Sequence, residues 1–206
     1  MDTIDWGLAQ RVGELLAGTP SYEQLPTDSV STLSKDFAAR VSAYAELQAP
    51  AALPSLEVID RPRWIEANLK SMRPLLEGVT PRLGQDLGAL SSVMGSASSF
   101  LLGVQVGAIA GMLSQRVLGQ YDVALLDAER QPRLLLVAPN LDKAANDLDV
   151  DPEQLIAWVA IHEITHAIQF AGAPWLREHL AGILTQLIES LQVSASMGEL
   201  LEMIRA

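Results

Sequence analysis

The stretch DPEQLIAWVAIHEITHAIQFAG, residues 151–172, is the most informative part of the chain. Asp151 is a favoured N-cap residue and Pro152 suits the first helical position, so a helix is predicted to begin here. Gly172 marks its end. The cap places the motif HEITH, residues 162–166, well inside this helix. The motif must therefore be interpreted as part of a helix.

In a helix, the two histidines of the motif leave the same face. Residues four apart are separated by about 40° around the axis, so His162 and His166 can share one metal ion. Glu163 follows the first ligand and is placed to take a proton from metal-bound water. The pattern predicts a zinc site with His162 and His166 as ligands and Glu163 as general base. The alternative is a His–Glu–His hydrogen-bond network in a helical core without metal.

Apolar residues surround this helix on nearly every side, which is typical of a buried helix. Its only charged residue after Glu153, apart from the histidines, is Glu163. We therefore expect Glu163 and both histidines to be buried. A buried carboxylate needs a partner because an unpaired charge is costly there, and zinc would supply one.

A third ligand is expected from the next predicted helix, residues 175–191. His179 lies at the border of the apolar face of this helix and is the best-placed candidate for the ligand. It can equally be an interfacial residue that supports the ligands. Glu178, Glu199 and Glu202 are weaker candidates. A metzincin is excluded, because the third histidine of that pattern would fall where this chain has Gly172.

Composition excludes several classes of protein. The chain has 206 residues with 49% hydrophobic content, enough to build a core and too apolar for disorder. It has no cysteine, so His and carboxylates remain as metal ligands. The net charge of −11 argues against nucleic acid or anionic lipid as partners. The N-terminus lacks the pattern of a signal peptide, and we expect a cytoplasmic protein.

The remaining sequence predicts a mainly α fold with a small β element before the HEITH helix. Residues 1–82 read as an N-terminal helical region, with helices around residues 8–16, 30–44 and after Asp60. Residues 83–206 form the metal-binding region, and the two regions can pack as one globular unit. Residues 134–137 are predicted to form a strand, which in zincins commonly pairs with an extended peptide substrate. Residues 142–151 are expected to be an acidic loop.

An uncharged segment, residues 87–115, contains a stripe of small residues at every fourth position: Gly95, Ser99, Gly103, Gly107 and Gly111. This predicts one continuous helix, from about residue 92 to 115, with another backbone close to the glycines. Length alone also permits a membrane span. The flanks lack a basic cluster and an aromatic belt, so we favour a buried helix in a globular domain.

Several blocks of the chain resemble the zincin-like metallopeptidases of type 2, a family with many actinobacterial members, some labelled as associated with coenzyme biosynthesis. The matching blocks are RVLGQYD at 116–122, LVAPN at 136–140, WVAIHEITHAIQF at 158–170 and PWLR at 174–177. The resemblance is close over about residues 83–184 and loose before them. It implies a mostly helical protein with zinc at His162 and His166 and Glu163 as base.

The resemblance does not supply a substrate. Members of the family continue beyond this length, with an acidic Glu-Gly segment that could supply a ligand or close the cleft. Three alternatives therefore stay open: His179 completes the site, the site is incomplete, or the sequence is a fragment. The leading hypothesis is a zinc-dependent metallopeptidase or related hydrolase that acts on a peptide or protein. The alternative is a non-catalytic zinc-binding or scaffold domain.

Overall fold

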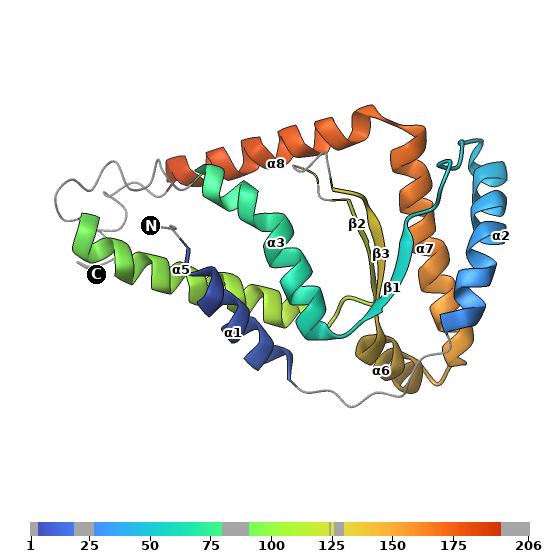
Figure 1. Cartoon of the computed structure of the whole chain (residues 1–206), viewed down its shortest axis with the longest axis horizontal. Coiled ribbons are helices and arrows are strands. Elements are labelled where there is room, and N and C mark those ends of the chain that lie inside the picture. Colours follow the sequence, from blue (N-terminus) through green and yellow to red (C-terminus); the bar gives the residue numbers. More distant parts are fainter. Residues whose placement is uncertain (1–3, 19–26, 80–90, 124, 126–129, 195–206) are drawn as a thin grey trace.

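A computed structural model describes residues 4–18, 27–79, 91–123, 125 and 130–194 of the chain (Figure 1). The fold is mainly α with one small sheet, as predicted. The helices are α1 (Trp6–Ala17), α2 (Thr27–Ala45), α3 (Arg61–Val79), α5 (Ser91–Ser114), α6 (Ala138–Leu148), α7 (Pro152–Gly172) and α8 (Trp175–Ser194). The strands are β1 (Ser55–Ile59), β2 (Gly119–Asp122) and β3 (Arg133–Val137).

The sheet joins segments that are distant in the sequence. Its order is β1-β3-β2, with β1 parallel and β2 antiparallel to β3. β1 precedes the boundary at residues 82 and 83 that we predicted, and β3 follows it. The boundary itself lies outside the described residues. Segments from both predicted regions thus share one sheet.

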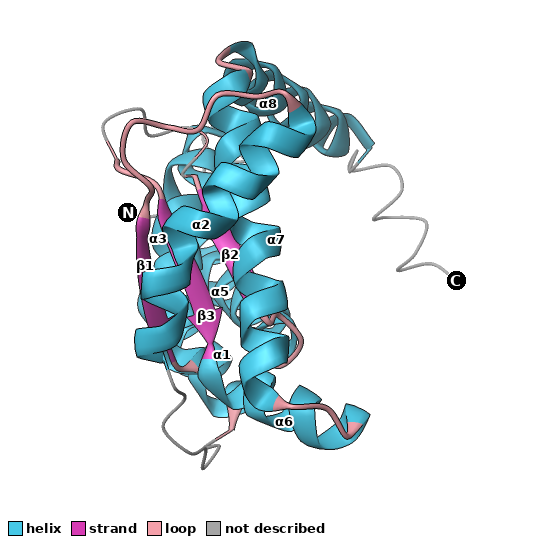
Figure 2. Ribbon diagram, turned by 90° about the vertical axis from the view of Figure 1, so that its right-hand side faces the viewer, coloured by secondary structure: helices cyan, strands magenta, loops and turns pink. Residues whose placement is uncertain are grey.

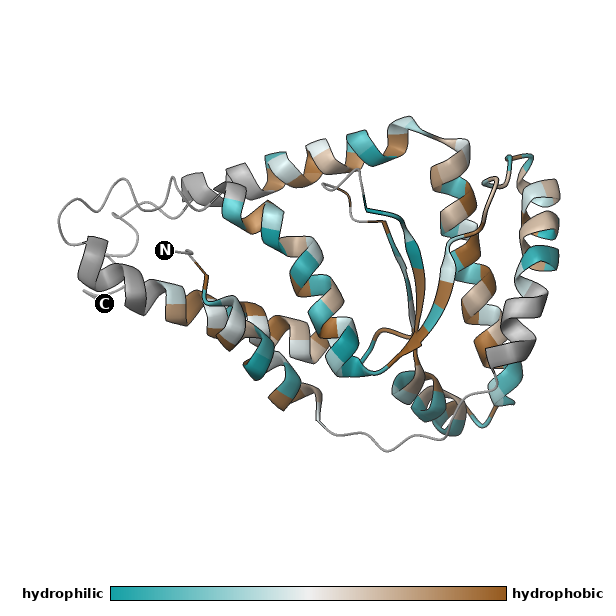
Figure 3. Ribbon diagram, in the orientation of Figure 1, coloured by the Kyte–Doolittle hydropathy of each residue, from teal (hydrophilic) through white to brown (hydrophobic). Residues whose placement is uncertain are grey.

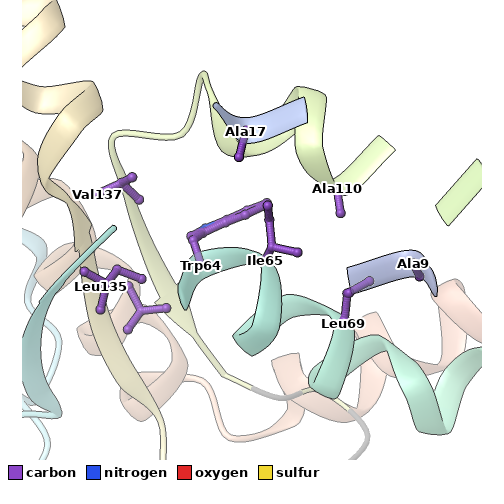
Figure 4. Close-up of a cluster of buried hydrophobic side chains, with 9 residues drawn as sticks. Ala9, Ala17, Trp64, Ile65, Leu69, Ala110, Leu135 and Val137 are labelled. Carbon is purple, nitrogen blue, oxygen red and sulfur yellow. The ribbon is translucent and has the colours of Figure 1, made fainter. Parts of the chain in front are cut away.

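Two layers of helices cover the two faces of this sheet (Figures 1 and 2). In β3, Leu135 and Val137 pack with Trp64 and Ile65 of α3, in a cluster that also includes residues of α1 and α5 (Figure 4). The alternate residues of β3, Leu134 and Leu136, pack in two clusters that include residues of α7. Because successive side chains of a strand point to opposite faces, this one buried strand holds α3 on one side and α7 on the other.

The stripe of small residues is an interface between two helices. A Cβ built on Gly107 would lie 2.3 Å from the carbonyl oxygen of Ala9 in α1, and one built on Gly111 would lie 2.7 Å from that of Gly13. A Cβ on Gly103 would lie 2.7 Å from the carbonyl oxygen of Asp5. The prediction that another backbone approaches these glycines is therefore confirmed, since only hydrogen fits in the space.

The expectation of a buried helix holds for the side of α5 that faces α1 but not for its other side. On the side of α5 away from α1, apolar residues are exposed, including Leu101, Ile109 and Met112. Figure 3 shows that much of the coloured part of this helix is hydrophobic. In the described part of the chain, no helix has the length and hydropathy that a membrane span requires.

Two other expectations also need correction. Residues 142–151 were expected to be a loop, but residues 142–148 belong to α6, in which Lys143, Asn146 and Asp147 are exposed. Val137 is the N-cap of α6 and Pro139 lies in its first turn, where proline is tolerated. The sequence analysis also missed β1, which lies between a proline-rich loop and α3. The strand predicted at residues 134–137 is confirmed as β3.

Candidate metal centre

Helix α7 positions the motif as its capping residues predict. The side chain of Asp151 accepts a hydrogen bond from the backbone N–H of Gln154, at 2.9 Å, and Pro152 occupies the first turn. The helix buries Ile156, Ala160, Ile164 and Ile168 against the sheet and α2. The opposite side is open, so the expectation of a helix buried all round, with both histidines inside, was wrong. Of the three motif residues, only Glu163 is buried; His162 is exposed and His166 is half-buried.

The imidazole rings of His162 and His166 lie close together. The Nε2 atom of His162 lies 3.2 Å from the Nε2 atom of His166, and their rings are nearly perpendicular. Two nitrogen ligands at about 2.0–2.1 Å from a tetrahedral zinc ion are separated by roughly 3.3–3.4 Å. The observed separation therefore fits a shared zinc ion. Without a metal, the same distance fits one N–H···N hydrogen bond between the rings.

The other ring nitrogen of His166 also has a partner. Its Nδ1 atom lies 3.0 Å from Oε1 of Gln169, one helical turn further along α7. Metal-binding histidines commonly donate their second ring N–H to such an acceptor. Sequence reasoning gave Gln169 no role. The spacing of three residues from His166 is the signal that could have identified it.

Glu163 lies beneath the histidines and is only 6% exposed. Burial raises the pKa of its carboxyl group above the ordinary value, because the charged form is poorly solvated there. His162, His166 and a hydrogen bond from the backbone N–H of Tyr121 act in the opposite direction and lower this pKa. A carboxyl group whose pKa is raised in this way suits an acid–base role near neutral pH.

Strand β2 passes directly over this carboxylate. A Cβ built on Gly119 would lie 2.9 Å from Oε1 of Glu163 and 2.7 Å from Cγ1 of Val159, so glycine permits the close approach. Sequence reasoning did not assign a role to Gly119 or to the backbone of Tyr121. Gly119 does lie in the block 116–122 that carries the family resemblance, but nothing in that block predicts which helix it meets.

The hydrogen-bond pattern shows which backbone groups of β2 face away from β3. The N–H of Val137 donates to the carbonyl of Leu118, at 2.9 Å, so Leu118 is directed toward β3. In an antiparallel pair this direction alternates, so the backbone groups of Gly119 and Tyr121 point to the outer edge. The bond from the Tyr121 N–H to Glu163 agrees with this pattern. The outer edge of the sheet and the candidate base are thus adjacent.

The structure does not group the predicted third ligand, His179, with the two histidines. His179, on α8, is exposed, and its ring packs edge-on against Trp175 at a centroid distance of 5.7 Å. Within the described residues, no three His, Asp or Glu side chains lie together in a group that could hold a metal ion. The structure brings His162 and His166 together but adds neither His179 nor Glu178 to them. Glu199 and Glu202 lie outside the described residues.

Comparison with known proteins shows the family to which the chain belongs. The sequence pattern of the family described as zincin-like metallopeptidases matches residues 4–206. A protein from Chloroflexus aurantiacus, whose crystal structure is described as that of a candidate hydrolase with a novel fold, superposes with a TM-score of 0.70 at 30% sequence identity. The alignment covers 90% of this chain and 59% of that protein, so this chain spans about three fifths of its length. No protein with a curated function matches the chain.

Proposed function

Because the chain belongs to the family of zincin-like metallopeptidases, we propose that it is a zinc-dependent hydrolase of peptide or amide bonds. One observation carries the proposal: two imidazole Nε2 atoms lie 3.2 Å apart beside a buried carboxyl group. His162 and His166 would hold the metal. A bound zinc ion would supply Lewis-acid activation of a water molecule and of the substrate carbonyl.

Glu163 would move the protons of the reaction. Its carboxylate would take a proton from the attacking water and later deliver it to the leaving nitrogen of the substrate. Its burial supports both steps, because a raised pKa brings proton uptake closer to neutral pH. The hydrogen bond from the Tyr121 N–H would hold the carboxylate in place between these steps.

An extended peptide would bind along β2 rather than along the strand that we first expected. The strand β3 is paired on both sides, by β1 and β2, so it has no free edge to offer. The backbone groups at the outer edge of β2 do not face β3, and this edge lies next to Glu163. Backbone pairing to such an edge is a common way to bind an extended peptide.

We propose His179 as the third ligand, as the sequence predicts. It begins the second turn of α8, a short distance along the chain from the end of α7. In the described residues, no third ligand side chain lies with His162 and His166. This favours one other function, a zinc-binding or scaffold domain without catalysis. In that case zinc would stabilise the fold or a partner surface.

Metal content and hydrolysis, measured on the same preparations, test the proposal. We expect about one zinc ion per wild-type chain and none in His162→Ala or His166→Ala, because the two ligands that remain bind zinc weakly. Glu163→Gln keeps the side-chain shape and should retain zinc. Its hydrolysis of a peptide library should fall by about 10²- to 10⁴-fold, the usual contribution of a general base.

The same measurements separate the two functions. A wild type that binds zinc but cleaves no peptide or amide in a broad library would favour the scaffold. Equal zinc content in wild type and His162→Ala would eliminate the zinc site itself. Loss of metal in Glu163→Gln would show that Glu163 supports the fold or the ligands instead of acting as the base.

A further inference from the structure

Gln169 makes a contact that controls which nitrogen of His166 is free. Its Oε1 atom lies 3.0 Å from His166 Nδ1, and an amide oxygen can only accept a hydrogen bond. With the amide in this orientation, His166 carries its proton on Nδ1, which leaves a lone pair on Nε2. We propose that Gln169 is a positioning residue that fixes His166 in this tautomer and so prepares Nε2 to bind a cation. The link to zinc rests on the proposed function.

This assignment determines the state of His162 in the metal-free protein. The two Nε2 atoms are 3.2 Å apart, and a hydrogen bond between them needs one proton. Since Nε2 of His166 accepts, Nε2 of His162 must donate. The neutral histidines would then hold opposite tautomers, His166 protonated on Nδ1 and His162 on Nε2.

Metal capture would then require a change in only one ring. His162 must transfer its proton from Nε2 to Nδ1, and its exposure allows water to carry out this exchange. His166 is already in the binding tautomer and keeps its orientation, because Gln169 lies on the same face of a continuous helix. Rotation of the Gln169 amide by 180° would direct its NH₂ group to Nδ1 and reverse both assignments. The two arrangements are therefore distinguishable.

Imidazole ¹H–¹⁵N correlation spectra of the metal-free full chain, recorded at about pH 8, above the pKa of imidazole in model peptides, test this proposal. The chain has three histidines, so each signal can be assigned with a single His→Ala variant. We expect the Nδ1–H tautomer at His166 and the Nε2–H tautomer at His162. Gln169→Ala should give a mixture at His166, whereas Gln169→Glu, which keeps an acceptor, should preserve the pure Nδ1–H form.

Zinc titration by calorimetry gives the second readout. Loss of such a partner typically weakens metal binding 10- to 100-fold, and Gln169 is exposed, so we expect about a tenfold loss in Gln169→Ala. Gln169→Glu should restore the wild-type affinity within a few-fold. Gln154→Ala, an exposed position on the same helix, is the matched control and should change neither the spectrum nor the affinity.

The outcomes separate this inference from the proposed function. An Nε2–H tautomer at His166 in the wild type, or unchanged tautomer and affinity in Gln169→Ala, would overturn the role of Gln169 and leave the zinc site intact. If the wild type shows the expected tautomers but binds no zinc, the positioning by Gln169 stands and the proposed function fails.

Discussion

Gly119 and Glu163 meet so closely that any side chain at residue 119 would displace the candidate base. A Cβ on Gly119 would lie 2.9 Å from Oε1 and 3.0 Å from Cγ of Glu163. Strand β2 therefore positions the carboxylate in two ways: it donates the Tyr121 N–H and leaves space at Gly119. This contact joins the edge strand of the sheet to the candidate base on α7.

Gly119→Ala should disturb the base more than the metal site. The new methyl group also meets Cγ1 of Val159 at 2.7 Å, so β2 or these side chains must shift, at a cost of about 1–3 kcal/mol for overpacking. We expect hydrolysis to fall while zinc content stays near that of the wild type. Gly182→Ala is the matched control, because a Cβ there meets nothing within 4 Å. A Gly119→Ala protein as stable and active as the control would show that β2 does not position Glu163.

Gly107→Ala should destabilise the fold without touching the site. Its Cβ would meet the carbonyl oxygen and Cα of Ala9 at 2.3 and 2.9 Å, and backbone atoms cannot rotate away. We expect the free energy of unfolding, measured in urea, to fall by about 1–3 kcal/mol and zinc affinity of the folded protein to be unchanged. Unchanged stability would mean that α1 and α5 do not pack backbone to backbone in solution.

Glu163→Gln should stabilise the metal-free protein, and more so as the pH rises. The folded-state pKa of Glu163 is raised by burial, so the folded protein binds more protons than the unfolded chain between the two pKa values. The carboxyl group therefore does not lower the free energy of unfolding at pH values below its pKa in the unfolded chain. Its destabilising effect grows as the pH rises through its pKa in the folded protein. Glutamine has no such effect.

Melting temperatures of both proteins, measured from about pH 4 to about pH 8 in a chelator, check this difference. A gap that is constant across the range, or that narrows with rising pH, would contradict a raised pKa at Glu163.

His179→Ala tests the third ligand predicted from the sequence. If His179 binds the metal, the variant should lose zinc affinity as strongly as His162→Ala, because two nitrogen ligands alone bind weakly. Glu178→Ala, at the neighbouring exposed position, should have no effect. Zinc affinity equal to that of the wild type would remove His179 from the site and leave its packing on Trp175 as its role.

The sequence alone determined the local elements of the site. Asp151 and Pro152 fix the start of α7, and the spacing of four residues then places His162 and His166 on one face whatever the rest of the chain does. The small residues at every fourth position likewise predict a close backbone partner for α5. Both results depend on helical periodicity, which is a property of neighbours in the sequence.

Only the tertiary structure decided which segments meet this helix. No local signal indicates that Gly119 lies against Glu163, because the contact depends on how β2 pairs with β3 and how β3 packs on α7. The burial of Glu163 and the exposure of His162 have the same origin: the sheet covers one side of α7 and leaves the other open. The helix is apolar nearly all round, so its sequence could not show which side would be covered. Long-range packing, which is the sum of many weak contacts, determines which side of α7 is covered.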